Sequence, residues 1–321
     1  MKKKLLLVGT LILALAGCSV KSDKIRFGAA ALGGTYREFA ENFSEIVGDT
    51  NENYAMEVKT TAGSAANIRL LSNDYIQLAI AQNDMIGDAY KGSGSFEGKK
   101  YQGYQAVAGL YTEACQIVVR ADSEINTVED LQGKTVSIGE EESGTEQNAI
   151  QILAAYGLSD KLVEEENLDY TSAAKGLEEG KIDAFFCTSG TPTTVISELA
   201  KECGIRLVSL DEKGMDKLMN SYGYYTACEI PEGSYTGQTE KVSTVGVKAV
   251  LLASDDLPEN TVKDITSILF ENKKKIQYTL MSDIELDEQT ATEGITIPFH
   301  KGAAAYYQEH GISVETGKKS K

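Results

Sequence analysis

The stretch IRFGAAALGGTYREFAENFSEIV, residues 25–47, predicts a strand, a glycine-rich turn and a helix in direct succession. Residues 25–27 have the composition of a short buried strand. From Tyr36 onward the apolar residues change to helical spacing, and the positions that share one face are Tyr36, Phe39, Ala40, Phe43 and Val47. Thr35 followed by Glu38 fits a capping box, so we expect the helix to begin there. This succession of elements is typical of an α/β fold.

The turn in this stretch predicts an anion-binding site. The start of a helix presents unpaired backbone N–H groups and about half a positive charge, and neither Gly33 nor Gly34 has a side chain that would keep a ligand from the backbone. The spacing Gly28-x4-Gly33-Gly34-Thr35 is close to that of a phosphate-binding loop, but Gly34 stands where such a loop needs lysine. A small carboxylate therefore fits better than a nucleoside triphosphate. The alternative is that these glycines only make a tight turn.

Residues 1–17 are predicted to be a lipoprotein signal peptide and not part of the fold. Residues 2–4 are three lysines, and the apolar run of residues 5–16 is too short to span a membrane as a helix of the mature protein. Leu15-Ala16-Gly17-Cys18 matches the lipobox of bacterial lipoproteins. The match implies cleavage before Cys18, lipidation of that cysteine, a tether over residues 18–24, and a protein held at the outer face of the cytoplasmic membrane. The alternative is a plain secretory signal with a chance cysteine.

The charge of the chain argues against several classes of partner. Three of the 31 Lys and Arg lie in residues 2–4, and the remaining 28 stand against 48 Asp and Glu. Such a surplus of negative charge argues against nucleic acid and against electrostatic docking on anionic lipid. An anionic ligand must then be attracted by local dipoles, because the overall field repels it.

The cysteines and histidines give no indication of a metal site. Four cysteines follow Cys18, and no two of them have CxxC spacing: Cys115, Cys187, Cys203 and Cys228. The chain has only two histidines, His300 and His310. We therefore expect no zinc site and no cofactor. A location outside the cytoplasm permits disulfides but does not require them, so four buried thiols remain the alternative.

Three strands of the first part of the chain lead to a polar or glycine-rich helix start. After the first unit, a strand over residues 54–60 leads to Gly63-Ser64, with Ser64 as the expected N-cap and Asn67 in the first helical turn. A buried strand over residues 75–81 then ends at Gln82, where a third helix is expected. Ligands gather at this edge of open α/β sheets.

The same pattern returns in the middle of the chain. A strand over residues 134–139 leads to a helix start at residues 143–145, and a buried strand over residues 184–187 leads to another at residues 191–193, where Pro192 suits the beginning of a helix. We expect a further strand over residues 168–170. The sequence therefore predicts a second set of strand–helix units whose helix starts also carry small polar residues.

The order of elements predicts two lobes joined by two crossings. Residues 106–120 resemble two strands broken around Thr112 and Glu113, and we expect the chain to cross near Cys115 and to return near Cys228. The expected boundaries are residues 25–114 and 230–321 for one lobe and residues 115–229 for the other. The last third adds a long strand pattern over residues 242–253 and three helical patterns over residues 258–272, 273–281 and 301–310. If the crossings run side by side, Cys115 and Cys228 lie near each other, at a separation that permits a disulfide.

Short motifs along the whole chain resemble those of one family of solute receptors. The first part contains Gly33-Gly34-Thr35-Tyr36, Ala62-Gly63-Ser64-Ala65-Ala66-Asn67 and Gln82-Asn83-Asp84. The second part contains Ser143-Gly144-Thr145-Glu146 and Gly190-Thr191-Pro192. These motifs are similar to those of the TAXI-type receptors of TRAP (tripartite ATP-independent periplasmic) transporters, and the resemblance covers essentially all of the chain after the tether.

This resemblance implies a type II periplasmic-binding-protein fold, in which two βα lobes joined by a two-strand hinge close on a ligand. It implies a binding protein and not an enzyme, which delivers its ligand to integral-membrane TRAP permease subunits driven by a sodium or proton gradient. Ligands of such receptors are small carboxylates, notably glutamate-like amino acids and 2-oxo dicarboxylic acids. The ligand-binding residues that the resemblance implies are Gly34, Thr35, Tyr36, Ser64, Asn67, Gln82, Ser143, Gly144, Thr145, Gly190, Thr191 and Pro192.

Charged residues near these positions bear on the choice of ligand. Residues 140–142 are three glutamates, which we expect in a solvated loop; near the ligand they would disfavour a dicarboxylate more than an amino acid, which carries its own ammonium. None of the five arginines is expected where the helix starts converge, so backbone N–H groups and hydroxyls are the expected partners of a carboxylate. Tyr222, Tyr224 and Tyr225 include a candidate aromatic wall, although core packing is expected for at least two of them.

Two other classes of function remain open from the sequence. The fold also occurs in enzymes, but the chain has no Gly-x-Ser-x-Gly elbow, and both histidines lie in its last tenth. A surface antigen or adhesin would account for the lipobox but not for three helix starts at one sheet edge. Among binding proteins the alternative is a receptor for an ATP-driven importer. A neighbouring gene for a multi-span permease, as opposed to one for an ATPase, would distinguish these two.

Overall fold

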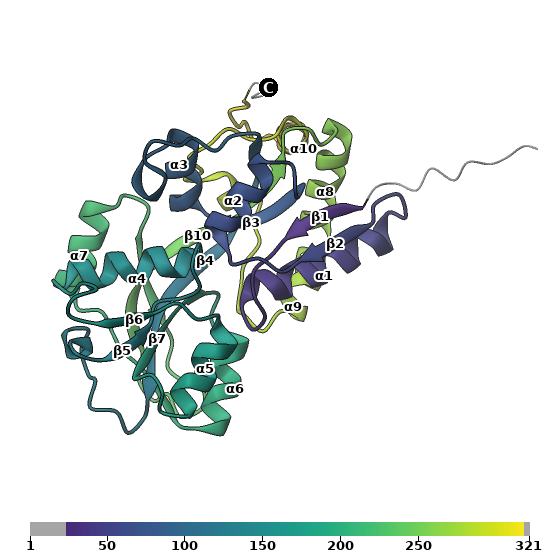
Figure 1. Cartoon of the computed structure of the whole chain (residues 1–321). Coiled ribbons are helices and arrows are strands. Elements are labelled where there is room, and N and C mark those ends of the chain that lie inside the picture. The colour runs from purple at the N-terminus through teal and green to yellow at the C-terminus, as the bar shows by residue number, and fades with distance from the viewer. Residues whose placement is uncertain (1–23, 318–321) are drawn as a thin grey trace, which may run out of the picture.

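The computed structural model describes residues 24–317 (Figure 1). The predicted signal peptide of residues 1–17, the predicted lipidation site Cys18 and all but the last residue of the tether lie outside the described residues. Within residues 24–317, no helix is both long enough and apolar enough to cross a membrane.

The N-terminal part folds as three strand–turn–helix units. The strands are β1 (Ile25–Gly28), β2 (Met56–Lys59) and β3 (Leu78–Gln82). They lead into α1 (Thr35–Thr50), α2 (Ser64–Ser72) and α3 (Asn83–Lys91), respectively. Because β1 pairs in parallel with both β2 and β3, the carboxyl ends of all three strands lie at one edge of the sheet.

The apolar face predicted for α1 is confirmed, but its predicted cap is wrong. Tyr36, Phe39, Ala40, Phe43 and Val47 are all buried, and the rings of Phe39 and Phe43 lie with their centroids 5.5 Å apart. Burying each phenylalanine side chain contributes about 1.5–3 kcal/mol. The N-cap residue is Gly34, and no side chain makes a capping hydrogen bond there. Packing therefore fixes the position of α1, and the Thr35 hydroxyl remains available for other contacts.

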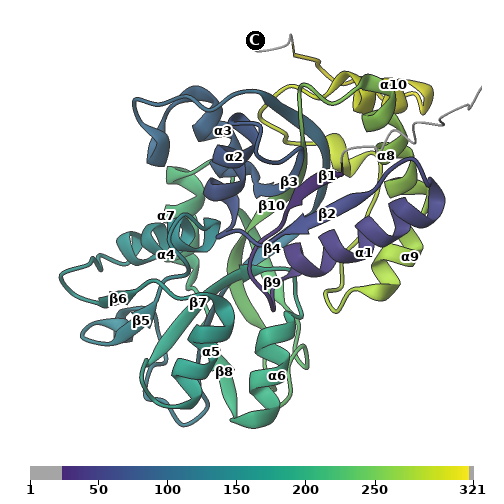
Figure 2. The same ribbon diagram turned by 45° about the vertical axis from the view of Figure 1, so that its right-hand side comes forward.

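Two long strands run through the middle of the molecule (Figure 2). β4 (Tyr104–Arg120) and β10 (Val242–Ser254) are antiparallel neighbours, paired from Gly246 with Ala114 to Ser254 with Tyr104. The predicted break around Thr112 and Glu113 does not occur. The strand continues because β10 pairs with it at both positions: Lys248 lies opposite Thr112, and Val247 lies opposite Glu113.

The middle of the chain extends the sheet on the other side of β4. The order after β4 is β7 (Ala184–Ser189), β5 (Thr135–Ser137) and β6 (Glu164–Glu166), while β8 (Ile205–Leu207) pairs with β4 and β9 (Thr226–Ile230) with β10. The helices are α4 (Gly144–Ala155), α5 (Tyr170–Glu178), α6 (Thr194–Glu202) and α7 (Glu212–Ser221). The strand predicted over residues 168–170 is wrong, because Asp169 caps α5 by accepting hydrogen bonds from the N–H groups of Thr171 and Ser172.

The C-terminal helices return to the N-terminal part (Figure 1). They are α8 (Glu259–Glu271), α9 (Lys273–Thr279) and α10 (Lys301–Glu309), which confirms the three helical patterns of this segment. The ring of Phe270 in α8 stacks on that of Tyr306 in α10, with centroids 5.7 Å apart. Short 3-10 helices also occur at Gly94–Phe96, Glu129–Leu131 and Thr290–Thr292.

Three hydrophobic clusters divide the described residues into two parts. The largest cluster is built from buried residues between 25 and 111 and between 249 and 307, and we call this part lobe 1. The other two are built from residues between 114 and 247, and we call this part lobe 2. Ile230 and Val242, which the sequence assigned to lobe 1, pack in lobe 2 because they pair with each other where β9 meets β10. We therefore propose that the chain returns to lobe 1 within β10 and not near Cys228.

The four cysteines of the described residues are free thiols. Cys115 on β4 and Cys228 on β9 lie on opposite sides of β10, since Cys228 pairs with Thr244 and the Thr244 hydroxyl donates to the carbonyl of Cys115. Two sheet spacings separate their backbones by about 9–10 Å, which exceeds the reach of a disulfide. The expectation that these two cysteines could be bridged is therefore wrong.

Alkylation without reductant tests this arrangement. In the native protein Cys115 and Cys187 should stay unlabelled, because both are buried and burial raises the pKa of each thiol. The partly exposed Cys203 and Cys228 should react first. After unfolding, peptide mapping should find the label on all four residues. A peptide pair joined through Cys115 and Cys228 would contradict the strand order.

Candidate functional site

A cavity lies between the two lobes. Its wall includes the starts of α1 and α2 from lobe 1 and the start of α4 from lobe 2. Eight residues predicted to bind a ligand line it: Gly34, Thr35, Tyr36, Ser64, Gln82, Ser143, Gly144 and Thr145. Segments far apart in the sequence thus meet around one space.

At the start of α1, the polar groups of Thr35 contact β7 of lobe 2 and a C-terminal segment of lobe 1. The backbone N–H of Thr35 donates to the hydroxyl oxygen of Ser189 at 3.2 Å. The Thr35 hydroxyl lies 3.0 Å from that of Ser189 and 2.7 Å from that of Ser282. Thr35 is therefore part of the contact between the lobes, which explains why it does not cap its own helix.

The start of α2 is closed by a carbonyl from the other lobe. The N–H groups of Ala65 and Ala66 donate to the carbonyl oxygen of Glu142, at 3.1 and 3.3 Å. The N-cap residue is Gly63 and not Ser64, because the Ser64 hydroxyl accepts a hydrogen bond from the N–H of Gln82 at 3.1 Å. A Cβ on Gly63 would lie 3.3 Å from the Cα of Ser143, so a glycine permits this close approach.

The start of α4 keeps free donors at the cavity. The helix start predicted at residues 143–145 is confirmed, and Ser143 is its N-cap, since its hydroxyl accepts from the N–H of Glu146 at 3.0 Å. Within residues 24–317, the N–H groups of Gly144 and Thr145 have no hydrogen-bond acceptor. Both residues line the cavity. Because a helix start carries about half a positive charge, these N–H groups form a ready anion site.

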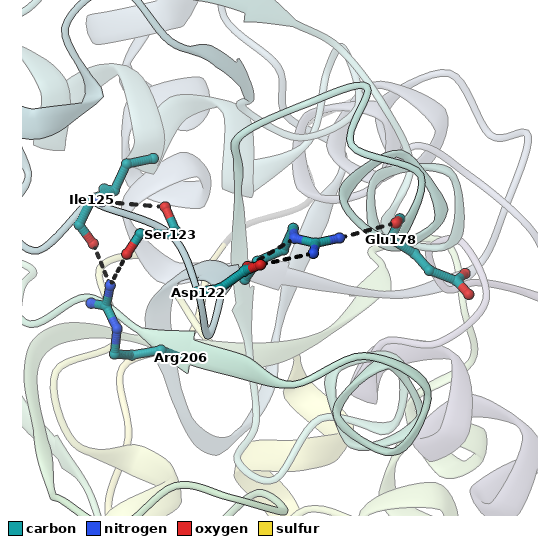
Figure 3. A network of polar contacts seen from close by, with 6 residues as sticks. Asp122, Ser123, Ile125, Glu178 and Arg206 are labelled. Atoms are coloured by element: carbon teal, nitrogen blue, oxygen red, sulfur yellow. Dashed lines mark hydrogen bonds and ion pairs between the residues drawn. The ribbon is translucent and has the colours of Figure 1, made fainter.

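The cavity wall contains acids but, among the described residues, no lysine, arginine or histidine. Its acidic residues are Glu113, Glu140 and Asp169. All five arginines have other partners; Figure 3 shows Arg206 donating to the carbonyls of Ser123 and Ile125 in lobe 2. A bidentate arginine clamp on a carboxylate is therefore not available at this site.

Glu113 is buried where β4 passes from one lobe to the other. The hydroxyl of Tyr36 donates to its Oε2 at 2.6 Å. Burial, and to a lesser extent the nearby Asp84, raises the pKa of Glu113 to about 8. Burial likewise raises the pKa of Asp84, which is also buried, to about 7. At neutral pH the free cavity thus holds a largely uncharged carboxyl group.

A model of the NMT1-like family matches residues 27–311. The chain belongs to the NMT1-like family. Among solved structures, it is similar to a periplasmic transporter, with a TM-score of 0.54 and 16% identity over 83% of this chain and 88% of that one. It is also similar to a putative L-cystine ABC transporter from Listeria monocytogenes, with a TM-score of 0.50 and 13% identity over 80% and 93% of the two chains. These likenesses confirm the predicted α/β periplasmic-binding-protein fold.

Asn67 of this NMT1-like chain does not line the cavity. Its side-chain amide donates to the carbonyls of Gly28, Ala29 and Ile80, at 3.3, 2.7 and 2.8 Å. It therefore ties the end of β1 to β3 beneath α2. We assign Asn67 a structural role.

Gly190, Thr191 and Pro192 also lie outside the cavity wall. The carbonyl of Thr191 accepts from the N–H of Asp283 at 2.9 Å, and that of Pro192 from the Ser282 hydroxyl at 2.9 Å. This segment of lobe 2 thus contacts the C-terminal part of lobe 1 beside the cavity. Ligand contact by these three residues stays a prediction that their position does not favour.

The expected solvated loop of residues 140–142 is wrong for two of its glutamates. Glu140 lines the cavity. Glu142 forms an ion pair with Arg69 of lobe 1, and its backbone is in the left-handed region (φ 66°), which turns its carbonyl toward α2. Only Glu141 is exposed. The three tyrosines at 222, 224 and 225 pack against one another and do not line the cavity.

The sequence reasoning missed several cavity residues. Tyr170 was assigned to a strand, and Glu113 to a break between strands. Thr188 and Ser189 also line the cavity. They lie at the carboxyl end of β7, so the rule applied to the other strands could have found them. The further residues not predicted are Ala30, Ala31, Ala62, Gly63, Glu140 and Asp169.

The structural role of Asn67 is testable by stability measurements. Asn67→Ala should lower the free energy of unfolding by about 2–4 kcal/mol, because three buried carbonyls lose their donor. Asn73→Ala is the matched control, since this exposed amide of the same helix region donates to one carbonyl, that of Arg69, and its loss should cost at most about 1 kcal/mol. Urea unfolding measures both. Equal stabilities of the two variants would refute the structural role.

Proposed function

We propose that this protein is an extracytoplasmic receptor that captures a small carboxylate-bearing solute by closing its two lobes. The observation that carries the proposal is the pair of free N–H groups of Gly144 and Thr145 at a cavity lined from both lobes. Each charge-assisted hydrogen bond to a carboxylate is worth about 1.5–3 kcal/mol. Two such bonds, with the hydroxyls around them, can hold a carboxylate without an arginine.

Closure is supported by the number of hydrogen bonds that join the lobes around the cavity. Besides the contacts of Thr35 and Glu142, the Gln82 amide donates to Asn148 at 3.0 Å across the interface. The start of α4 lies close to the end of β3, since a Cβ on Gly144 would lie 2.1 Å from the Gln82 amide oxygen. A ligand bound between such surfaces is excluded from water, which strengthens its polar contacts.

An amino acid is a better candidate than a 2-oxo dicarboxylate. A dicarboxylate would bring two negative charges to a wall with three acids and no base. An amino acid brings one ammonium, which these acids can attract, and one carboxylate for the start of α4. The glutamate-like amino acids suggested by the motif resemblance therefore fit this cavity better than the 2-oxo acids.

For the membrane partner we propose integral-membrane TRAP permease subunits. The support is the series of TAXI-type motifs, among them Ser143-Gly144-Thr145-Glu146 at the cavity. The second candidate is an ATP-driven importer, because one structurally similar protein is a putative ABC transporter for L-cystine. A surface antigen without transport would not need donors at a cavity lined from both lobes. Copurification of the receptor with a permease or with an ATPase-containing complex distinguishes the partners.

Ligand binding should close the lobes, and two measurements test this. In a thermal-shift screen of the L-amino acids and small carboxylic acids, a ligand at 100 times its Kd should add about 2.7 kcal/mol of stability. Small-angle scattering should then show a smaller radius of gyration with that ligand than without it. Gly144→Ala should lose both responses, whereas Gly223→Ala, whose Cβ would meet open space, should keep them. A scattering profile that does not change at saturation would contradict closure.

The proposed anchor is tested at Cys18. Cys18→Ser should move the protein from the membrane fraction to the soluble fraction of bacterial cells, because acyl chains supply the attachment. Cys203→Ser, which changes a thiol far along the same chain, should leave the distribution unaltered. Membrane attachment that survives the loss of Cys18 would exclude the lipid tether.

A further inference from the structure

We propose that Glu113 recognises a protonated amine of the solute and releases its own proton to solvent when that solute binds. The inference rests on the proposed function, because it takes the cavity between the lobes as the binding site. It adds a residue that determines specificity and a proton that accompanies binding.

The first argument is the position of Glu113. The residue lines the cavity, yet only 2% of its surface is exposed. Its strand is fixed on both sides, by Val247 of β10 opposite it and by the pairing of β4 with β7 that begins at the next residue, Ala114. The Tyr36 hydroxyl holds Oε2. The carboxyl group is therefore oriented within a rigid part of the fold, as a recognition group must be.

The second argument is the absence of a compensating cation among the described groups around it. The titratable groups that face Glu113 are Tyr36 from α1, Asp84 from α3, Tyr111 and Cys115 from β4, Tyr170 from α5 and Cys187 from β7. None of these can be positively charged. Lys248 of β10 pairs with the neighbouring Thr112, but its ammonium donates to the carbonyls of Thr290 and Glu293.

The free protein therefore keeps Glu113 largely protonated at pH 7, in line with its pKa of about 8. An incoming ammonium supplies the missing positive charge. The neutral carboxyl and the ammonium then become a carboxylate–ammonium pair, and the carboxyl proton passes to the buffer; no other bond is made or broken. A 2-oxo acid lacks the amine and cannot drive this exchange.

The direction of the pH dependence follows from this balance. Below about pH 8 each bound amine displaces about one proton, so the affinity for an amino acid should rise about tenfold per pH unit. Above that pH the carboxyl is already ionised, and the affinity should level off. For the matching 2-oxo acid the affinity should fall above about pH 8, because ionised Glu113 repels it.

Calorimetry in phosphate and in Tris measures the proton directly, since the two buffers differ in ionisation enthalpy. The first pair of probes is L-glutamate and 2-oxoglutarate. Each of the other common L-amino acids is then compared with its own 2-oxo acid in the same way. At pH 7 the amino acid should release about one proton and the 2-oxo acid none. Glu113→Gln should abolish the release and weaken the amino acid at least tenfold, while the 2-oxo acid keeps its affinity within threefold.

Two further variants keep the test decisive. Glu141→Gln removes an exposed carboxylate of the loop before α4 and should leave proton release unchanged. Tyr36→Phe removes the hydroxyl that stabilises the ionised carboxylate, so the pH at which the affinity levels off should rise. This variant tests the inference even if Glu113→Gln does not fold.

The possible failures can be told apart. If no probe binds the native protein, both the proposed function and this inference are overturned. If amino acids bind without proton release, or bind Glu113→Gln as tightly as the native protein, only the inference is overturned. If Glu140→Gln abolishes the release and Glu113→Gln does not, the amine is recognised by the other cavity glutamate and the assignment to Glu113 is wrong.

Discussion

The pairing of β4 with β10 is the constraint on which the rest of the structure depends. Both strands run from one hydrophobic cluster into the others, so the connection between the lobes is itself part of both cores. The sheet of lobe 1 continues from β10 through β3, and that of lobe 2 from β4 through β7. Irregularities in the ladder, between Ala249 and Val250 and between Leu251 and Leu252, occur on the lobe 1 side. Relative movement of the lobes must therefore bend or twist this one pair of strands.

Much of the fold could be predicted because it is encoded locally. The apolar face of α1 has helical spacing, and strands that end in glycine or small polar residues mark the edge where the cavity lies. The motif resemblance then identified eight residues of the cavity wall. These features need only a short window of sequence, and no knowledge of distant partners.

The errors share a different physical cause, which is competition from hydrogen-bond partners elsewhere in the fold. Thr35 and Ser64 have the residue types of N-caps, but their hydroxyls contact Ser189 and the backbone of Gln82 instead. Glu113 resembles a break in a strand because a charged residue interrupts an apolar run, and only its pairing with β10 shows that the strand continues. Such contacts between separate elements, 18 residues apart for Ser64 and Gln82 and 154 for Thr35 and Ser189, leave no periodic pattern in the sequence.

The carbonyl of Glu142 at the start of α2 has a consequence for the empty receptor. When the lobes separate, water must replace this carbonyl at the N–H groups of Ala65 and Ala66, so part of the closed contact forms without any solute. In the proposed closing motion, a solute therefore adds to contacts that the lobes already make with each other and shifts the balance toward the closed arrangement. A backbone atom makes this contact, so it needs no charged side chain, whereas salt weakens the adjoining ion pair of Glu142 with Arg69. For the receptor proposed above, ionic strength would therefore act on the contact between the lobes through this ion pair, while the main-chain contact would stay unaltered.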